Sequence, residues 1–122
     1  MIKLTFCLVR LPQLTAEDFR TYWEDVHGPL VSSLAEDLGI RRYAQLYSLP
    51  SDIQRTLRPS PEPTPQFDGV ATVWFDSLES FAANYRRPEA RAAVARVLED
   101  EARFIDLARS PLWWSEEKVF VG

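Results

Sequence analysis

The sequence predicts an α+β domain in which two main helices pack on one face of a four-stranded antiparallel sheet. Four segments have the alternating pattern of β-strands: residues 2–10, 40–49, 70–75 and 115–121. The stretches after the first and third of these segments carry apolar residues at helical spacing, which gives the order βαββαβ. With 122 residues, 46% of them hydrophobic and 26% charged, the chain is predicted to form one domain over residues 1–122.

The first strand, residues 2–10, is predicted to be largely apolar on both faces. One face carries Leu4, Phe6 and Leu8, and the other carries Thr5, Cys7 and Val9. Pro12 ends the strand because a proline nitrogen has no hydrogen to donate.

The first helix is predicted to begin at Thr15, a good N-cap residue. Phe19, Trp23 and Val26 follow at helical spacing, so this side of the helix is predicted to be buried. Because a proline disfavours helical geometry at the residue before it, the helix is predicted to stop at Gly28–Pro29.

A second short helix is predicted over residues 30–38, with Gly39 as its C-terminal cap. The strand at 40–49 then places Tyr43, Gln45 and Tyr47 on one face, which would suit a polar-lined pocket. The alternative is that these tyrosines are ordinary half-buried strand residues.

Residues 50–66 contain five of the nine prolines and are predicted to form a long extended loop between strands. Long loops of this kind are either lids over a site or disordered segments, and both interpretations stay open. The next helix is predicted to be capped by Asp76 and to continue, after an interruption, from Pro88. The stretch from Asp100 then brings Phe104 and Ile105 to the core.

The composition excludes several classes of protein. A net charge of −4, with no basic face, argues against nucleic-acid binding. The longest apolar runs are about four residues, far below the roughly 20 that span a bilayer, and no signal peptide is recognisable. Because Cys7 is the only cysteine, an internal disulfide is excluded and a cytoplasmic location is expected.

The predicted order βαββαβ is most economically folded as a ferredoxin-like sandwich with both helices on one sheet face. The opposite face would then be uncovered, although the first and third strands are apolar on both faces. The simplest cover is a second copy of the chain, so a homodimer is expected.

Three segments resemble the EthD-domain family of the dimeric α+β-barrel group. They are F-x-x-Y-W-x-x-x-H-G-P-L at residues 19–30, FDGVATVWFDS at 67–77 and DEARFID at 100–106. The resemblance runs nearly end to end and is interrupted by the proline-rich loop. It implies a homodimer whose two sheets form a barrel, with pockets between sheet and helices. Members range from proteins of ether-degradation loci, alongside an oxidising system, to fungal aromatic polyketide dehydratases.

The first candidate for chemistry is His27, the only histidine, because its unperturbed pKa lies near neutrality. Asp106 could orient it or act alone, which would make His27 and Asp106 the catalytic residues. The residues expected to bind substrate are Tyr22, Trp23, Tyr43, Tyr47 and Trp74. The structural alternatives are that His27 donates to a main-chain carbonyl and shapes the HGP turn, and that Asp106 is a cap or ion-pair partner. A helix C-terminus would favour charged His27 and burial would favour the neutral form, which leaves its charge open.

No phosphate loop, serine elbow, dinucleotide fingerprint or metal-ligand spacing is present, so neither a cofactor nor a metal is expected. Haem ligation by His27 stays an alternative in this fold group. Two functions remain open. One is a cofactor-free enzyme, a dehydratase, cyclase or oxidoreductase-associated protein, acting on an aromatic, polyketide-like or other hydrophobic metabolite. The other is a non-catalytic carrier of such a metabolite for a neighbouring oxidising enzyme.

Overall fold

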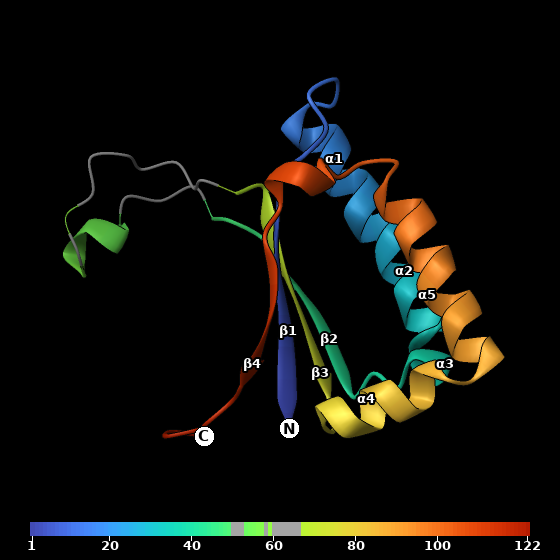
Figure 1. Cartoon of the computed structure of the whole chain (residues 1–122). Helices are drawn as coiled ribbons and strands as arrows, with labels where there is room; N and C mark the ends of the chain where they lie inside the picture. Colours follow the sequence, from blue (N-terminus) through green and yellow to red (C-terminus); the bar gives the residue numbers. More distant parts are fainter. Residues whose placement is uncertain (50–52, 58, 60–66) are drawn as a thin grey trace.

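The computed structural model describes residues 1–49, 53–57, 59 and 67–122 of the chain. Within this part, four strands form one antiparallel sheet in the order β2-β3-β1-β4, and the strands are Ile2–Leu8 (β1), Arg42–Leu46 (β2), Gly69–Phe75 (β3) and Leu112–Glu116 (β4). Figure 1 shows the helices α1 to α5 gathered on one face of this sheet. The predicted α+β architecture and strand order are confirmed.

The helical segments are more numerous than the sequence predicted. They are α1 (Ala16–Tyr22), the π-helical turn η1 (Trp23–His27), α2 (Gly28–Ser33), α3 (Ala35–Leu38), the 3-10 turn η2 (Ile53–Thr56), α4 (Leu78–Tyr85), α5 (Pro88–Glu101) and the 3-10 turn η3 (Leu107–Arg109). None of these helices is long and apolar enough to cross a bilayer.

The prediction that Gly28–Pro29 stops the first helix is wrong. Gly28 has helical dihedral angles, φ −55° and ψ −54°, and the chain passes through η1 directly into α2. In η1 the N–H of Gly28 donates to the carbonyl of Trp23, five residues back, which is the π-helical pattern. Pro29 is tolerated because it lies in the first turn of α2, where a missing N–H costs little.

The π-helical turn also changes which side chain faces inward. Val26, predicted to be buried, is 47% exposed, whereas His27 is only 5% exposed. His27, four residues after Trp23, lies on the same side of the helix as regular spacing predicts. The widened turn moves Val26 off this side and leaves the histidine there alone.

Several predicted helix ends are confirmed and one is wrong. Thr15 caps α1 by accepting from the N–H of Asp18, and Gly39 ends α3 with a left-handed φ of 74°. Pro88 is the first residue of α5. The cap of α4, however, is Ser77 in a reciprocal pair with Ser80, and not Asp76.

The last strand lies earlier in the chain than predicted. The β4 strand ends at Glu116, whereas residues 119–121 were predicted to belong to it and are largely exposed. The register explains the difference, because Glu116 pairs with Ile2, the first residue of β1. Beyond Glu116 the neighbouring strand offers no further backbone groups to pair with.

The main hydrophobic core lies between the sheet and the helices, and it consists of Leu8, Phe19, Trp23, Ala71, Phe104 and Ile105. The burial of Phe104 and Ile105 was predicted and is confirmed. At the start of β3, the indole of Trp23 lies directly against the backbone of Gly69. A Cβ at this position would lie 2.4 Å from a ring carbon of Trp23, so only glycine fits here.

The opposite face of the sheet has no described element packed on it (Figure 1). Its centre is a row of paired residues in which Thr5 lies between Thr72 and Trp113. Beside this row Trp74 stacks with Lys3 and Arg42, whose charged groups lie 4.7 and 4.8 Å from the ring centroid. The loop prediction for residues 50–66 falls mostly on residues outside the described part of the chain, which there contains only 53–57 and 59.

Candidate functional site

A cleft of about 380 Å³ lies between the helix-covered face of the sheet and the helices. Most of its lining is aliphatic or aromatic. The lining residues come from all four strands, from η1 to α3, and from α4 and α5. The polar side chains that line it are His27, Tyr43, Glu101 and Ser110. A volume in this range suits a small organic ligand, and few polar groups in an apolar wall are typical of ligand pockets.

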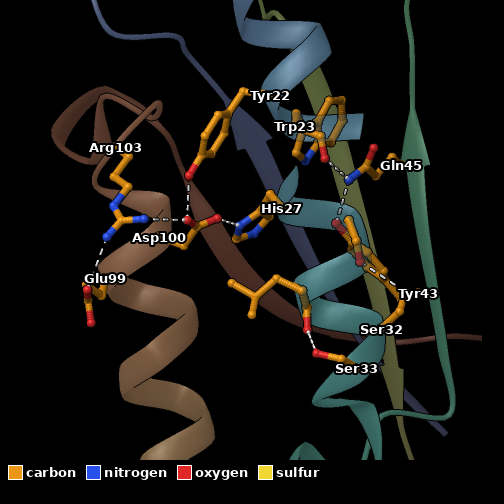
Figure 2. A network of polar contacts seen from close by, with 12 residues as sticks. Tyr22, Trp23, His27, Ser32, Ser33, Tyr43, Gln45, Glu99, Asp100 and Arg103 are labelled. Carbon is orange, nitrogen blue, oxygen red and sulfur yellow. Dashed lines mark hydrogen bonds and ion pairs between the residues drawn. The ribbon is translucent and has the colours of Figure 1, made fainter. Parts of the chain in front are cut away.

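His27 is held by a carboxylate on α5. Its Nδ1 lies 2.8 Å from Oδ2 of Asp100, whose side chain is 2% exposed. The other carboxylate oxygen accepts a hydrogen bond of 2.6 Å from the hydroxyl of Tyr22 and lies 3.5 Å from the guanidinium of Arg103. Figure 2 shows these three side chains converging on Asp100.

The charge state of this group follows from its surroundings. Although burial opposes it, hydrogen bonds from Tyr22 and His27 hold the pKa of Asp100 below its ordinary value, so the carboxylate is ionised at neutral pH. Burial lowers the pKa of His27, and the attraction of Asp100 only partly opposes this effect. The imidazole is therefore neutral at neutral pH, which resolves the question that the sequence left open. Since an ionised carboxylate only accepts hydrogen bonds, Nδ1 carries the proton.

The other ring nitrogen of His27, Nε2, opens into the cleft. Nε2 forms no hydrogen bond with any described residue. Every fully buried side-chain nitrogen or oxygen in the described part of the chain does have a partner, so Nε2 is not one of the fully buried atoms. Nε2 is therefore accessible, and the cleft is the space that His27 lines. A neutral imidazole in this tautomer presents a lone pair, which is the form that accepts a proton.

The π-helical turn that presents His27 is tied to the sheet by Gln45. Its Nε2 donates to the carbonyl of Trp23 at 2.9 Å and to the hydroxyl of Tyr43 at 2.8 Å (Figure 2). The hydroxyl of Tyr47 donates to the side-chain oxygen of Gln45. A Cβ at Gly28 would lie 3.1 Å from the Gln45 nitrogen, so the glycine leaves room for this contact.

Glu101 is the second titratable group of the cleft. It is 8% exposed and forms no hydrogen bond or ion pair through its side chain among the described residues. Burial, together with the neighbouring charge of Asp100, raises the pKa of Glu101 to about 7. Burial also raises the pKa of Tyr43 to about 12, so its phenol stays neutral.

The structure brings together only some of the residues predicted from the sequence. His27, Trp23 and Tyr43 line the cleft. Tyr22 reaches Asp100 and thereby supports His27 from behind. Tyr47 packs edge-on against Trp23 with ring centroids 5.2 Å apart, outside the lining of the cleft.

Two predicted site residues lie elsewhere. Trp74 is on the uncovered face of the sheet, stacked with Lys3 and Arg42. Asp106 forms no hydrogen bond or ion pair with His27. Its N–H donates to the carbonyl of Val9, and its side chain makes no hydrogen bond or ion pair within the described residues. The carboxylate that orients the histidine is Asp100. The alternative that His27 donates to a main-chain carbonyl is also wrong, because its Nδ1 is hydrogen-bonded to the side chain of Asp100.

The sequence contained a signal for the two missed acids. The apolar stripe of α5 runs through Ala93, Val94 and Val97, and the same helical period places Asp100 and Glu101 on this buried side. Two adjacent acids at the apolar face of a helix are unusual, and they begin the DEARFID motif. Among the described residues, no three His, Cys, Asp or Glu side chains gather as a metal-binding group.

Comparison with known proteins identifies the fold and one family. The family model of the EthD domain matches residues 11–108 of the chain. An EthD family protein from Bacillus halodurans is similar in structure, with a TM-score of 0.65 and 20% identity over 97% of this chain and 99% of that one. An EthD-like protein from Ralstonia eutropha has a TM-score of 0.66 and 22% identity over 98% and 94% of the two chains.

A third structure is described as a dimeric protein of unknown function with a ferredoxin-like fold, from Bacteroides fragilis. It has a TM-score of 0.59 and 13% identity over 95% of both chains. At these identities the matches establish the fold, and they confirm the ferredoxin-like prediction.

The role of Asp100 can be tested on the titration of the only histidine. In the wild-type protein, NMR of the His27 ring should give a pKa below the ordinary 6.5. Asp100→Asn should lower this pKa further, because it removes the negative charge that favours the imidazolium ion. Asp106→Asn is the matched control and should leave the pKa of His27 unchanged. The opposite pattern, a shift with Asp106→Asn alone, would return the orienting role to Asp106.

Proposed function

Because the chain belongs to the EthD-domain family, we propose that it binds a hydrophobic small molecule in the cleft and that His27 transfers a proton to or from it. A single observation carries this proposal. His27 lines an apolar cleft of about 380 Å³, and its Nδ1 lies 2.8 Å from a carboxylate oxygen of buried Asp100.

The chemistry that suits this arrangement is general base catalysis. A proton taken by Nε2 would leave an imidazolium ion, whose charge the adjacent Asp100 carboxylate would stabilise at 2.8 Å. Asp100 would also keep the ring in the tautomer that presents a lone pair, as the buried acid does in catalytic triads. Removal of a proton next to a carbonyl group is the step shared by dehydrations and cyclisations of polyketide-like compounds, so this reaction class is favoured.

The second candidate function is a carrier that holds a hydrophobic metabolite for an oxidising enzyme. The observation that favours it is the lining of the cleft, which is almost entirely apolar and would bind such a molecule without any chemistry. The two functions differ in what His27 contributes. In an enzyme it would be needed for turnover, and in a carrier it would only fill part of the wall.

The proposal can be tested with 1-tetralone as a model hydrophobic ketone. Its exchange of α-protons for deuterium in D2O, followed by NMR, measures proton abstraction directly. Wild-type protein should accelerate the exchange, and His27→Gln should reduce this acceleration by roughly a hundredfold or more, the usual scale for a lost general base. Binding of 1-tetralone to the variant should remain.

Two other outcomes would contradict the catalytic role. Binding of 1-tetralone without faster exchange by the wild-type protein would favour the carrier. A lower melting temperature of His27→Gln is expected in either case, because the variant removes a partner of buried Asp100. If the exchange falls only in proportion to the folded protein, however, His27 is structural.

We further propose that two copies of the chain associate through the uncovered sheet face. The face combines a row of small and aromatic residues around Thr5 and Thr72 with a polar edge at Trp74, as interfaces commonly do. The dimeric state of the similar protein from Bacteroides fragilis supports this proposal.

Light scattering after size exclusion should give a mass of about twice 14.1 kDa. Thr5→Arg places a charge at the centre of the proposed interface and should shift the protein toward monomer. Ala92→Arg adds the same side chain on the exposed surface of α5 and should leave the dimer intact. A wild-type monomer at micromolar concentration, or equal effects of the two variants, would exclude this interface.

A further inference from the structure

Glu101, at the C-terminal end of α5, is a buried acid for which the described residues provide no partner. The residue is 8% exposed, and no described residue forms a hydrogen bond or ion pair with its side chain. Buried polar groups are nearly always satisfied, because an unpaired one loses its water without compensation. Among the described residues, every side-chain oxygen that is itself fully buried has a partner. The unpaired carboxyl oxygens of Glu101 are therefore accessible, and the cleft that Glu101 lines is the space that they reach.

The groups around Glu101 explain why its pKa is raised. Asp100 precedes it on α5 and carries a negative charge, while His27 from η1 and Tyr43 from β2 line the same cleft and are neutral. Ser110, after η3, adds a hydroxyl, and the remaining lining from the strands, α2, α3 and α4 is apolar. With a pKa of about 7, Glu101 is protonated in mildly acidic solution and still about half protonated at neutral pH.

The cleft also lacks any charge that would bind an anion. None of the side chains that line it belongs to lysine or arginine. A carboxylate or phosphate entering it would lie beside Glu101 without a compensating cation. An ammonium group would need Glu101 to ionise beside Asp100, whose charge is already compensated by Tyr22, His27 and Arg103.

We propose that Glu101 is the ligand-contacting hydrogen-bond donor of the cleft, and that the cleft selects an uncharged hydrophobic molecule with a carbonyl or hydroxyl oxygen. This inference rests on the proposed function, because it takes the cleft to be the ligand site. The protonated carboxyl group of Glu101 donates to the ligand oxygen. The ligand thereby becomes the partner that the described residues do not supply.

The inference predicts a particular pH dependence of binding. As the pH rises through the pKa of Glu101, the donor is lost and a negative charge appears beside the ligand oxygen. At pH 8.5 only about 3% of a group with a pKa near 7 remains protonated. Burial shifts the pKa of His27 downward and that of Tyr43 upward, so Glu101 is the cleft group whose charge should change most between pH 6 and 8.5.

Equilibrium dialysis with four naphthalene probes of similar size provides the test. They are 2-acetonaphthone (a ketone), 2-ethylnaphthalene (apolar), 2-naphthoate (an anion) and 1-(2-naphthyl)ethylamine (a cation at these pH values). The wild-type protein should bind 2-acetonaphthone about thirtyfold more weakly at pH 8.5 than at pH 6, in proportion to the protonated fraction of Glu101. Its affinity for 2-ethylnaphthalene should be the same at both pH values, and it should bind the two charged probes more weakly than the ketone at pH 6.

Glu101→Gln is the matched variant, because its amide is a donor at every pH and never becomes charged. It should bind 2-acetonaphthone equally well at pH 6 and 8.5. Glu101→Leu should bind the ketone no better than 2-ethylnaphthalene at either pH.

Three results would overturn the inference while leaving the proposed function intact. They are ketone binding by the wild-type protein that does not change with pH, a loss of affinity at pH 8.5 that persists in Glu101→Gln, and a preference for either charged probe. If the wild-type protein binds none of the four probes at pH 6, the proposed function fails as well, because the cleft is then not a site for hydrophobic ligands.

Discussion

The structure depends on the contact between His27 and Asp100, two side chains 73 positions apart in the sequence. It joins the π-helical turn η1 to the end of α5 across the helical layer, and it buries a negative charge. Such a charge persists only where donors surround it, and here Tyr22, His27 and Arg103 supply them. Removing one partner of a buried charged pair typically lowers the free energy of unfolding by about 3–5 kcal/mol. The relative position of η1 and the end of α5 is therefore strongly constrained.

The same contact determines what the cleft can do. It orients the imidazole, makes Nδ1 the protonated nitrogen and leaves Nε2 for a ligand, while Gln45 fixes the turn that carries the ring. The charge of Asp100 also acts on Glu101, whose pKa it helps to raise. Burial together with this one carboxylate therefore leaves an acceptor, His27, and a partly protonated donor, Glu101, in one apolar cleft at neutral pH.

The alternation of strands and the helical periodicity were sufficient to predict the fold, and the lone histidine predicted from the sequence lines the cleft. The errors have local physical causes. A π-helical turn, which regular helical spacing does not reveal, moved Val26 off the buried side and left His27 there. The orienting acid was placed at Asp106 because long-range pairing cannot be read from one sequence. The helical period of α5, extended by one turn, would have indicated Asp100 and Glu101.

The central claim is that burial keeps the His27 imidazole neutral, while the contact with Asp100 places its proton on Nδ1 and leaves a free lone pair on Nε2. Nitrogen-15 NMR of the single histidine at pH 7.5 tests this claim most directly, because the two ring nitrogens give separate shifts that report their protonation. We expect a protonated Nδ1 and an unprotonated Nε2. A ring protonated at both nitrogens, or at Nε2 alone, would contradict the account.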